Sequence, residues 1–432
     1  MKKFTRIAAF LLVALMMVSV AAIAAAEIVV TLPHYKTGEN VGAKFFEPQV
    51  ARFNEKYDGQ YEIVIEEITQ EMYADKMKQL TQQKKLPFLV EQYDTDWMTN
   101  VIVPNGLYYD LTEFLAEHPE VDSLIPDYDR EFNTREHGYV SLNYNVVRPI
   151  GLYYNADMVA LEKTPGAYAD WAEFEAALGE NKLAHMTGEN AWTSVLVLSA
   201  MIAQEEGGVE LLNAHTVDKL ADFSHPAIVN AVAKFQAHLQ KFASANTVGA
   251  IYADAANTFM SKNAAVIANG SWMVGDFAED GGKWSNGFDG ATVKAGMFPG
   301  NVGIASTTGG YGWFIPATTK GDELEVAKAF LAFMMSKEEL EYYMLAEGGS
   351  HQGFEPSEEF LAKRAADSVL LDEYCSAVNA ETVMIPNLSD CMPNSVAAST
   401  FGTLLPKLID GSYTAEQFCE QLTKAAAEAL DL

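Results

Sequence analysis

Carboxylate pairs are the residues of this chain whose spacing most readily suggests chemistry. Secreted glycoside hydrolases act through two such groups, and Glu66 with Glu67 or Asp94 with Asp96 could supply them. With 59 acidic residues in a chain of 432, however, pairs of this kind arise by chance. The chain has no Gly-x-Ser-x-Gly elbow, no His-Glu-x-x-His motif and no Walker loop. The sequence therefore predicts no catalytic residues, and a glycoside hydrolase remains only an alternative.

Metal-ligand patterns are also missing from the sequence. The eight histidines are scattered, without a close pair at metal-ligand spacing. Residues 127–131 carry alternating acids, but Phe132 stands where a calcium loop needs glycine. We predict neither a metal nor a cofactor. One pair among Cys375, Cys391 and Cys419 could form a disulfide in an exported protein, and the sequence does not select the pair.

The N-terminus has the pattern of a secretory signal. Lys2, Lys3 and Arg6 precede an apolar run, and the alanines at 24–26 fit a signal-peptidase site. We predict that residues 1–26 are removed after Ala26, which places the mature protein in the periplasm or outside the cell. The alternative is an uncleaved anchor, because residues 7–26 are long enough to span a bilayer.

The mature chain is strongly acidic. Removing the three basic residues of the signal moves the formal net charge from -30 to -33. An acidic surface repels nucleic acid and anionic lipid, so we expect neither as a partner.

The order of the predicted elements indicates an α/β fold. Strands at 27–32, 61–65 and 88–93 alternate with helices at 45–57 and 72–84, which favours a parallel sheet covered by helices. Further elements are predicted as strands at 139–144, 264–267, 293–298 and 311–315 and as helices at 171–178, 193–205, 227–242 and 257–261, with mostly helical structure from 357 onward.

The chain is expected to form two lobes from non-contiguous segments. We assign residues 27–146 and 307–348 to the first lobe and residues 147–306 and 349–432 to the second. Several crossings without a flexible linker predict a hinge between the lobes.

Several short sequences, taken together in their order and spacing, resemble one protein family. They include FNEKY at 53–57, GLYYNAD at 151–157, NGSW at 269–272 and GGYGWFIP at 309–316. In these segments the chain is similar to the extracellular solute-binding proteins of bacterial ABC importers, in particular the carbohydrate-binding group that includes maltose-binding protein. One departure bears on the ligand subclass: the family often has Gly-x-x-Pro-Asp-Val where this chain has KLPFLV at 85–90.

The resemblance implies a two-lobe fold of the periplasmic-binding-protein type II, with a hinge and an interlobe cleft. The lobes would close around a small solute without catalysis, and the closed form would be presented to the transmembrane permease subunits of an ABC importer. We expect a monomer that binds a sugar or oligosaccharide. A non-sugar solute such as a polyamine is the alternative on the same scaffold.

A sugar site needs aromatic rings for the C–H faces and planar polar groups for the hydroxyls. The resemblance implies that Trp272 faces the cleft and that Trp192 offers a second ring. Trp313 could serve there or pack in the core. Asp94 and Asp96 follow a predicted strand, where they could accept hydrogen bonds from vicinal hydroxyls or cap the next helix. Other candidates lie at strand ends or on returning segments, where the sheet edge faces a crevice: His34, Tyr35, Lys36, Asn143, Asn145, Tyr311 and His351.

Overall fold

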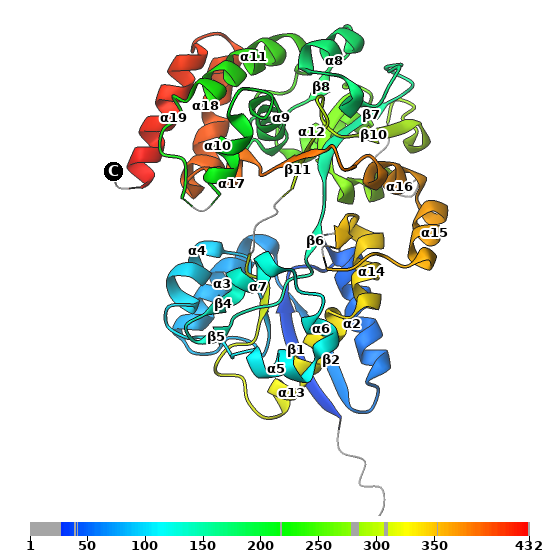
Figure 1. Ribbon diagram of the computed structural model, residues 1–432, viewed down its shortest axis with the longest axis vertical. Helices are drawn as coiled ribbons and strands as arrows, with labels where there is room; N and C mark the ends of the chain where they lie inside the picture. The colour runs from blue at the N-terminus through cyan, green and yellow to red at the C-terminus, as the bar shows by residue number, and fades with distance from the viewer. Residues whose placement is uncertain are drawn as a thin grey trace, which may run out of the picture. The chain divides into compact units, whose positions relative to one another are not determined.

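The computed structural model describes residues 27–38, 40, 42–216, 218–277, 285–305, 310–351 and 353–430 (Figure 1). The predicted signal, 1–26, and residues 307–309 of the glycine-rich stretch lie outside the described residues. The chain divides into two compact units built from separated segments. Unit 1 contains the chain up to His118, Arg135–Leu142 and Tyr311–Ser336, and unit 2 contains Pro119–Thr134, Asn143–Gly310 and Lys337–Leu432. The lobe boundaries predicted above stay a prediction.

Unit 1 begins with a parallel strand pair. The β-branched residues of β1 suit a strand, and β1 pairs with β2 from Ile28 opposite Tyr61 to His34 opposite Glu67. The connection between them contains α2, as a parallel pair requires. The elements of unit 1 are β1 (Ile28–His34), α2 (Ala43–Lys56), β2 (Tyr61–Glu67), α3 (Gln70–Gln82), β3 (Val90–Glu91), α4 (Thr95–Trp97), η1 (Met98–Ile102), α5 (Thr112–Glu117), β5 (Gly138–Tyr139), β12 (Trp313–Phe314) and α13 (Asp322–Met334), and β4 (Thr134–Arg135) lies at the passage between the units.

Three strands predicted for this unit are shorter than expected. The segments predicted at 88–93 and 311–315 contain only the two-residue strands β3 and β12, and the segment predicted at 139–144 overlaps β5 at Tyr139 alone. β3 pairs with β12 in antiparallel orientation, so the expected parallel arrangement holds for β1 and β2 alone. Leu142 and Trp313 exchange both backbone hydrogen bonds, at 2.9 and 2.8 Å, as an isolated bridge. β3 and β12 pair at two positions and Leu142 pairs with Trp313 at one, so these segments form no continuous ladder.

Unit 2 contains a six-stranded mixed sheet. Its order is β14-β11-β7-β9-β8, with β10 also paired to β7. β7 is buried along its whole length, and it pairs antiparallel with β9 and β10. The core on this sheet includes α9 and α11, and α11 also contacts α18 and α19 (Figure 1). A sheet covered by helices explains why β7 and β9 are buried at every position.

The predicted helices of unit 2 are present. The segment 171–178 is α8, and 227–242 falls within α11, which begins one residue earlier at Pro226. The elements of unit 2 are α6 (Pro119–Asp122), α7 (Asp127–Asn133), β6 (Val146–Val147), β7 (Ile150–Asn155), η2 (Pro165–Ala167), α8 (Trp171–Leu178), β8 (Leu183–Ala184), α9 (Trp192–Ile202), α10 (Gly208–Ala214), α11 (Pro226–Phe242), α12 (Tyr252–Met260), β9 (Val266–Gly270), η3 (Ser271–Phe277), η5 (Gly290–Thr292), β10 (Val293–Gly296), β11 (Val302–Ile304), α14 (Lys337–Glu347), β13 (Ser350–His351), α15 (Glu358–Asp367), α16 (Val369–Ser376), β14 (Val383–Ile385), α17 (Leu388–Cys391), η6 (Val396–Thr400), α18 (Phe401–Ile409) and α19 (Ala415–Ala429).

The disulfide considered from the sequence is not formed. Cys375, Cys391 and Cys419 are all free thiols. Cys391 and Cys419 are buried in the core of unit 2, and Sγ of Cys391 donates a hydrogen bond to the carbonyl oxygen of Leu212 at 3.3 Å. The C-terminal helices are therefore held by packing.

A membrane-spanning segment is not found in the described part of the chain. None of the helices between 27 and 430, outside the gaps given above, combines the length and the apolar character that a bilayer crossing requires.

An aromatic contact joins α2 to α13 in unit 1. The ring centroids of Phe53 and Phe330 lie 5.0 Å apart in an edge-to-face arrangement, and both side chains are fully buried. We expect Phe330→Ala to lower the free energy of unfolding of unit 1 by about 3–5 kcal/mol, because it removes buried surface and leaves a cavity. Urea unfolding followed by circular dichroism measures this. Val369→Ala on the exposed face of α16 is the control and should change stability by less than about 0.5 kcal/mol. A loss below about 1 kcal/mol for Phe330→Ala would contradict this packing.

Candidate functional site

Three aromatic side chains of unit 2 form a row, which we call the aromatic row: Trp192, Trp272 and Tyr252. Trp192 is the first residue of α9, Trp272 lies in η3 directly after β9, and Tyr252 is the first residue of α12. The ring centroids of Trp192 and Trp272 are 5.9 Å apart, and those of Trp192 and Tyr252 are 6.2 Å apart. All three side chains are half-buried. Partly exposed rings at this spacing can stack against the apolar face of a small molecule.

The sequence interpretation named two members of this row and missed the third. Trp192 and Trp272, which lie 80 positions apart in the chain, are brought together. Tyr252 was missed because the helix predicted at 257–261 begins five residues earlier, at Tyr252. The NH2 group of Asn269 donates to the Tyr252 hydroxyl at 2.9 Å, which fixes the position of the ring.

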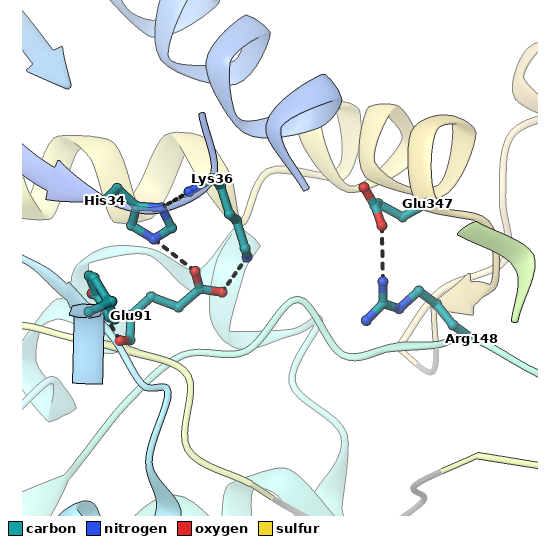
Figure 2. A network of polar contacts seen from close by, with 6 residues as sticks. His34, Lys36, Glu91, Arg148 and Glu347 are labelled. Carbon is teal, nitrogen blue, oxygen red and sulfur yellow. Dashed lines mark hydrogen bonds and ion pairs between the residues drawn. The ribbon is translucent and has the colours of Figure 1, made fainter. Parts of the chain in front are cut away.

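Arg148 lies against the aromatic row. Its guanidinium group is 4.8 Å from the ring centroid of Trp272 and 5.8 Å from that of Tyr343. Nη1 of Arg148 also lies 3.0 Å from Oε2 of Glu347, a pair that Figure 2 shows. The hydroxyl of Ser271 donates to the backbone oxygen of Glu347 at 2.8 Å. The charge of Arg148 is therefore balanced within the protein, and its position is fixed by contacts to η3 and α14.

A second polar group, which we call the amide cluster, consists of Asp129, Asn133, Asn143, Asn145 and Gly310. The Asp129 carboxylate is almost fully buried and accepts hydrogen bonds from the side-chain amides of Asn133 (3.1 Å), Asn143 (2.8 Å) and Asn145 (3.3 Å). The Asn143 amide also donates to the carbonyl oxygen of Gly310 at 2.6 Å. Burial raises the pKa of Asp129 above its ordinary value, although the amide hydrogen bonds oppose this shift.

The amide cluster borders a pocket of about 240 Å³. The stacked rings of Tyr144 and Tyr343, with centroids 4.5 Å apart, form part of its wall. The pocket is thus lined by aromatic rings, amides and the paired Arg148. Its lining residues are Tyr128, Asp129, Asn143, Tyr144, Asn145, Val146, Val147, Arg148, Gly310 and Tyr343.

Asp129 is a residue that sequence reasoning missed. The sequence presents residues 127–131 only as a calcium loop, and Phe132 rules out that interpretation. The spacing of Asp129 and Asn133, one helical turn apart on α7, is a local signal that the two side chains can meet. Asn143, Asn145 and Gly310 have no such spacing relative to Asp129, because only the tertiary structure brings them to α7.

The loop that leads to Trp192 is held by polar contacts at both of its ends. The hydroxyl of Ser194 donates to the carbonyl oxygen of Met186 at 2.6 Å, and the backbone N–H of Met186 donates to Oγ1 of Thr193 at 3.0 Å. Glu189 and Ala191 have positive φ values of 51° and 50°, a conformation that non-glycine residues rarely adopt. The loop is therefore held in a specific conformation that places Trp192 at the start of α9.

Two buried imidazoles form a polar chain that ends at Ser194 in α9. Nε2 of His185 lies 3.1 Å from Nε2 of His238, and Nδ1 of His238 lies 2.7 Å from Oε1 of Glu175. Nδ1 of His185 lies 3.3 Å from Oγ of Ser194. Burial, and then the neighbouring His238, lower the pKa of His185 well below its ordinary value. His185 is therefore neutral, and the chain connects α8 and α11 to the start of α9.

In unit 1, a separate polar network lies at the ends of β1 and β3 (Figure 2). The backbone N–H of Lys36 donates to Nδ1 of His34 at 3.0 Å, so Nε2 of His34 carries the proton and donates to Glu91 at 2.9 Å. Nζ of Lys36 lies 2.6 Å from the other carboxylate oxygen of Glu91. Burial opposes the ionisation of Glu91, but the charge of Lys36 and the hydrogen bond from His34 outweigh it and lower the pKa of Glu91 to about 2.

Tyr35 and Trp313 pack around this network. The rings of Tyr35 and Trp313 stack on His34, with centroid distances of 4.9 and 5.2 Å. Trp313 also stacks on Phe46 and is almost fully buried, so the structure places it in the core of unit 1. Tyr35 is buried and lies edge-to-face with Tyr93, which is exposed.

The two predicted carboxylates of unit 1 lie at α4: Asp94 directly precedes the helix and Asp96 is within it. Asp94 caps this helix by accepting from the backbone N–H of Trp97 at 2.9 Å, and it forms an ion pair with Lys78. Asp96 is exposed in the first turn. Both carboxylates line a pocket of about 390 Å³ that also includes Lys78 and Trp97. The capping role considered from the sequence is present for Asp94.

Tyr311 and His351 are the remaining predicted residues. Tyr311 is half-buried and packs against the core of unit 1. His351 is buried in unit 2, where its ring stacks on Phe354 at 4.5 Å and its Nδ1 accepts from the backbone N–H of Gly353 at 2.8 Å. Burial lowers the pKa of His351 to about 4. Among the residues that the structure describes, no group of three or more His, Cys, Asp or Glu side chains could hold a metal ion.

Comparison with known proteins adds a family and a fold. A family described as "Bacterial extracellular solute-binding protein" matches residues 49–350. Comparison with curated proteins gave no match. Many solved structures are similar to this chain. The three described next are 16–19% identical to it, so their likeness establishes the fold alone.

Three of these structures illustrate the likeness. A chitin oligosaccharide binding protein has a TM-score of 0.70 and 19% identity, with 93% of this chain and 99% of that chain covered. A Streptococcus pneumoniae solute-binding protein in complex with the blood group A-trisaccharide has a TM-score of 0.67 and 16% identity, with coverage of 92% and 99%. An ABC substrate-binding protein from Listeria monocytogenes in complex with cycloalternan has a TM-score of 0.65 and 16% identity, with coverage of 94% and 100%.

The depressed pKa of Glu91 makes the stability of unit 1 depend on pH. A carboxylate whose pKa falls from an ordinary 4.5 to about 2 on folding stabilises the folded state above pH 4.5, and this stabilisation is lost as the pH falls toward 2. Between pH 5 and pH 3, the free energy of unfolding of the wild-type protein should fall. In Glu91→Gln this fall should be smaller by on the order of 1–3 kcal/mol, because the Glu91 carboxylate is absent. Urea unfolding at both pH values measures this. The control Glu67→Gln, at an exposed position of β2, should keep the wild-type pH dependence, and an unchanged pH dependence in Glu91→Gln would contradict the network.

Proposed function

Because the chain belongs to the bacterial extracellular solute-binding protein family, we propose that it captures a sugar or oligosaccharide and delivers it to the membrane permease of an ABC importer. The observation that carries this proposal is the aromatic row beside the amide-lined pocket of unit 2. Sugars combine apolar C–H faces with a rim of hydroxyl groups, and this site combines stacking rings with planar hydrogen-bonding groups.

The charge balance of the site supports an uncharged solute. The guanidinium of Arg148 is neutralised by Glu347 at 3.0 Å, so it offers little net attraction to an anion. The carboxylate of Asp129 is surrounded by N–H donors from three asparagines and the Gly310 backbone, so its charge is already stabilised without a cationic ligand. These pairings favour a neutral sugar over an organic anion or a polyamine.

We propose that the family's export route and mode of action also apply here. The mature protein would begin after Ala26, act as a monomer outside the cytoplasm and leave its solute chemically unchanged. Capture would be coupled to an equilibrium between an open and a closed form. A solute then shifts this equilibrium toward the closed form only to the extent that it binds the closed form more tightly than the open form.

The class of solute is tested by thermal unfolding with a panel of compounds. The panel contains maltotriose, raffinose, N,N′-diacetylchitobiose, spermidine and citrate. A neutral sugar present at 1,000 times its Kd should stabilise the protein by about 4 kcal/mol, which raises the melting temperature by several degrees. Stabilisation by spermidine or citrate alone would overturn the proposed class, and release of monosaccharides from any panel sugar would show an enzyme.

Two neighbouring tyrosines on α14 test whether the pocket takes part in binding. Tyr343 lines the pocket and stacks on Tyr144, whereas the ring of its neighbour Tyr342 is 38% exposed and is not among the lining residues. We expect Tyr343→Ala to raise the Kd for the panel sugar that binds wild type most tightly by about tenfold, because an aromatic contact contributes about 0.5–1.5 kcal/mol beyond its buried area. Isothermal titration calorimetry measures the Kd. Tyr342→Ala should stay within twofold of wild type, and equal effects of the two variants would contradict the assignment of the pocket.

A further inference from the structure

The hydrogen-bond directions in the amide cluster determine which atoms the pocket offers to a solute. An asparagine amide can present either its NH2 group or its carbonyl oxygen, and rotation about its last side-chain bond exchanges the two. An ionised carboxylate can only accept hydrogen bonds. Asp129 therefore selects one orientation for each amide that contacts it: the NH2 group must face the carboxylate.

Both N–H bonds of each pocket amide are used inside the protein. Nδ2 of Asn143 donates to Oδ1 of Asp129 at 2.8 Å and to the carbonyl oxygen of Gly310 at 2.6 Å. Nδ2 of Asn145 donates to Oδ2 of Asp129 at 3.3 Å and to the carbonyl oxygen of Asn143 at 3.2 Å. Asn143 and Asn145 are half-buried and line the pocket. With their NH2 groups directed inward, their Oδ1 atoms are the groups left for a solute.

We propose that Asp129 is a positioning residue that fixes specificity: it holds the amides of Asn143 and Asn145 with their carbonyl oxygens available, so that the pocket selects solutes that donate hydrogen bonds from hydroxyl groups. This inference rests on the proposed function and deepens it. Asp129 is almost fully buried and acts through the two amides, which contact the solute in its place.

The position of Asp129 suits this role. Asn133, one turn further along α7, donates to Oδ1 of Asp129 at 3.1 Å and to the carbonyl oxygen of Gly310 at 2.9 Å. The backbone of Gly310 also hydrogen-bonds to the carboxylate. A carboxylate accepts at about four lone-pair sites, and these donors occupy them. Asp129 is thus held rigidly, and it can in turn hold Asn143 and Asn145.

The test compares Asp129→Asn with Asp127→Asn. Both variants lose one negative charge on the same helix, but Asp127 is exposed. Asparagine at 129 has nearly the same shape as aspartate and can donate as well as accept, so the neighbouring amides are free to rotate. The probes are maltotriose, raffinose and N,N′-diacetylchitobiose, together with monodeoxyfluoro derivatives of whichever sugar binds wild type most tightly. Fluorine replaces a hydroxyl group without being able to donate.

We expect Asp129→Asn to raise the Kd for the parent sugar at least tenfold. We also expect it to reduce the fluorination penalty, which is the factor by which the Kd rises when fluorine replaces a hydroxyl group of the sugar. Asp127→Asn should match wild type in both quantities. A Kd within twofold of wild type would overturn the inference. A higher Kd with the full fluorination penalty retained would also overturn it. A merely structural role would weaken binding without changing the preference for hydroxyl groups that donate hydrogen bonds. If none of the three sugars binds wild type, the proposed function itself fails, which is a distinguishable result.

A second variant decides the question if Asp129→Asn does not fold. Asn145 has a φ of 52°, and glycine adopts this conformation without strain. Asn145→Gly therefore removes one carbonyl acceptor without straining the backbone. A fivefold or larger rise in the Kd for the same sugar supports the inference, and a Kd within twofold of wild type overturns it.

Discussion

The geometry of the candidate site depends on the contacts of the Arg148 guanidinium group. A charged group that is partly removed from water needs an opposite charge and good packing. Arg148 obtains the first from Glu347 and the second from the rings of Trp272 and Tyr343. These partners come from segments more than a hundred positions away in the chain. Because one side chain meets all of them, η3, α14 and the segment before β7 are held together around it.

The site is built from polar groups whose hydrogen bonds are largely satisfied before any solute arrives. Glu347 is occupied by Arg148, and Asp129 is occupied by amides. Groups held in this way lose little conformational freedom on binding, and preorganisation of this kind lowers the cost of association. The same principle applies in unit 1, where Glu91 is shared by His34 and Lys36.

The sequence predicted those parts of the fold that local patterns determine. The helices α8 and α11 follow from apolar spacing, and α8 begins after the capping residue Asp170, which accepts from the backbone N–H of Glu173 at 2.8 Å. The strands predicted at 88–93, 139–144 and 311–315 were too long, because apolar composition alone does not show how many residues find a partner strand. Trp313 illustrates the same limit: its place in the apolar run suited either a core or a binding role, and its stacking on His34 and Phe46 was not visible in the sequence.

The candidate site was only partly predictable. The resemblance indicated Trp192 and Trp272, and the structure brings their rings together. Asn143 was expected at a strand end, but the direction of its amide depends on Asp129 and Gly310, which no local pattern connects to it. Whether these residues bind a solute stays a prediction.

The burial of the native thiols has a practical consequence for labelling the protein. Burial raises the pKa of Cys391 and of Cys419 to about 12, and it also raises the pKa of Cys375. Since the thiolate is the reactive form, all three should react slowly with maleimides at neutral pH. A single cysteine introduced at an exposed position could then carry a fluorophore without removal of the native ones, and such a conjugate would turn the chain into an optical reporter of its solute.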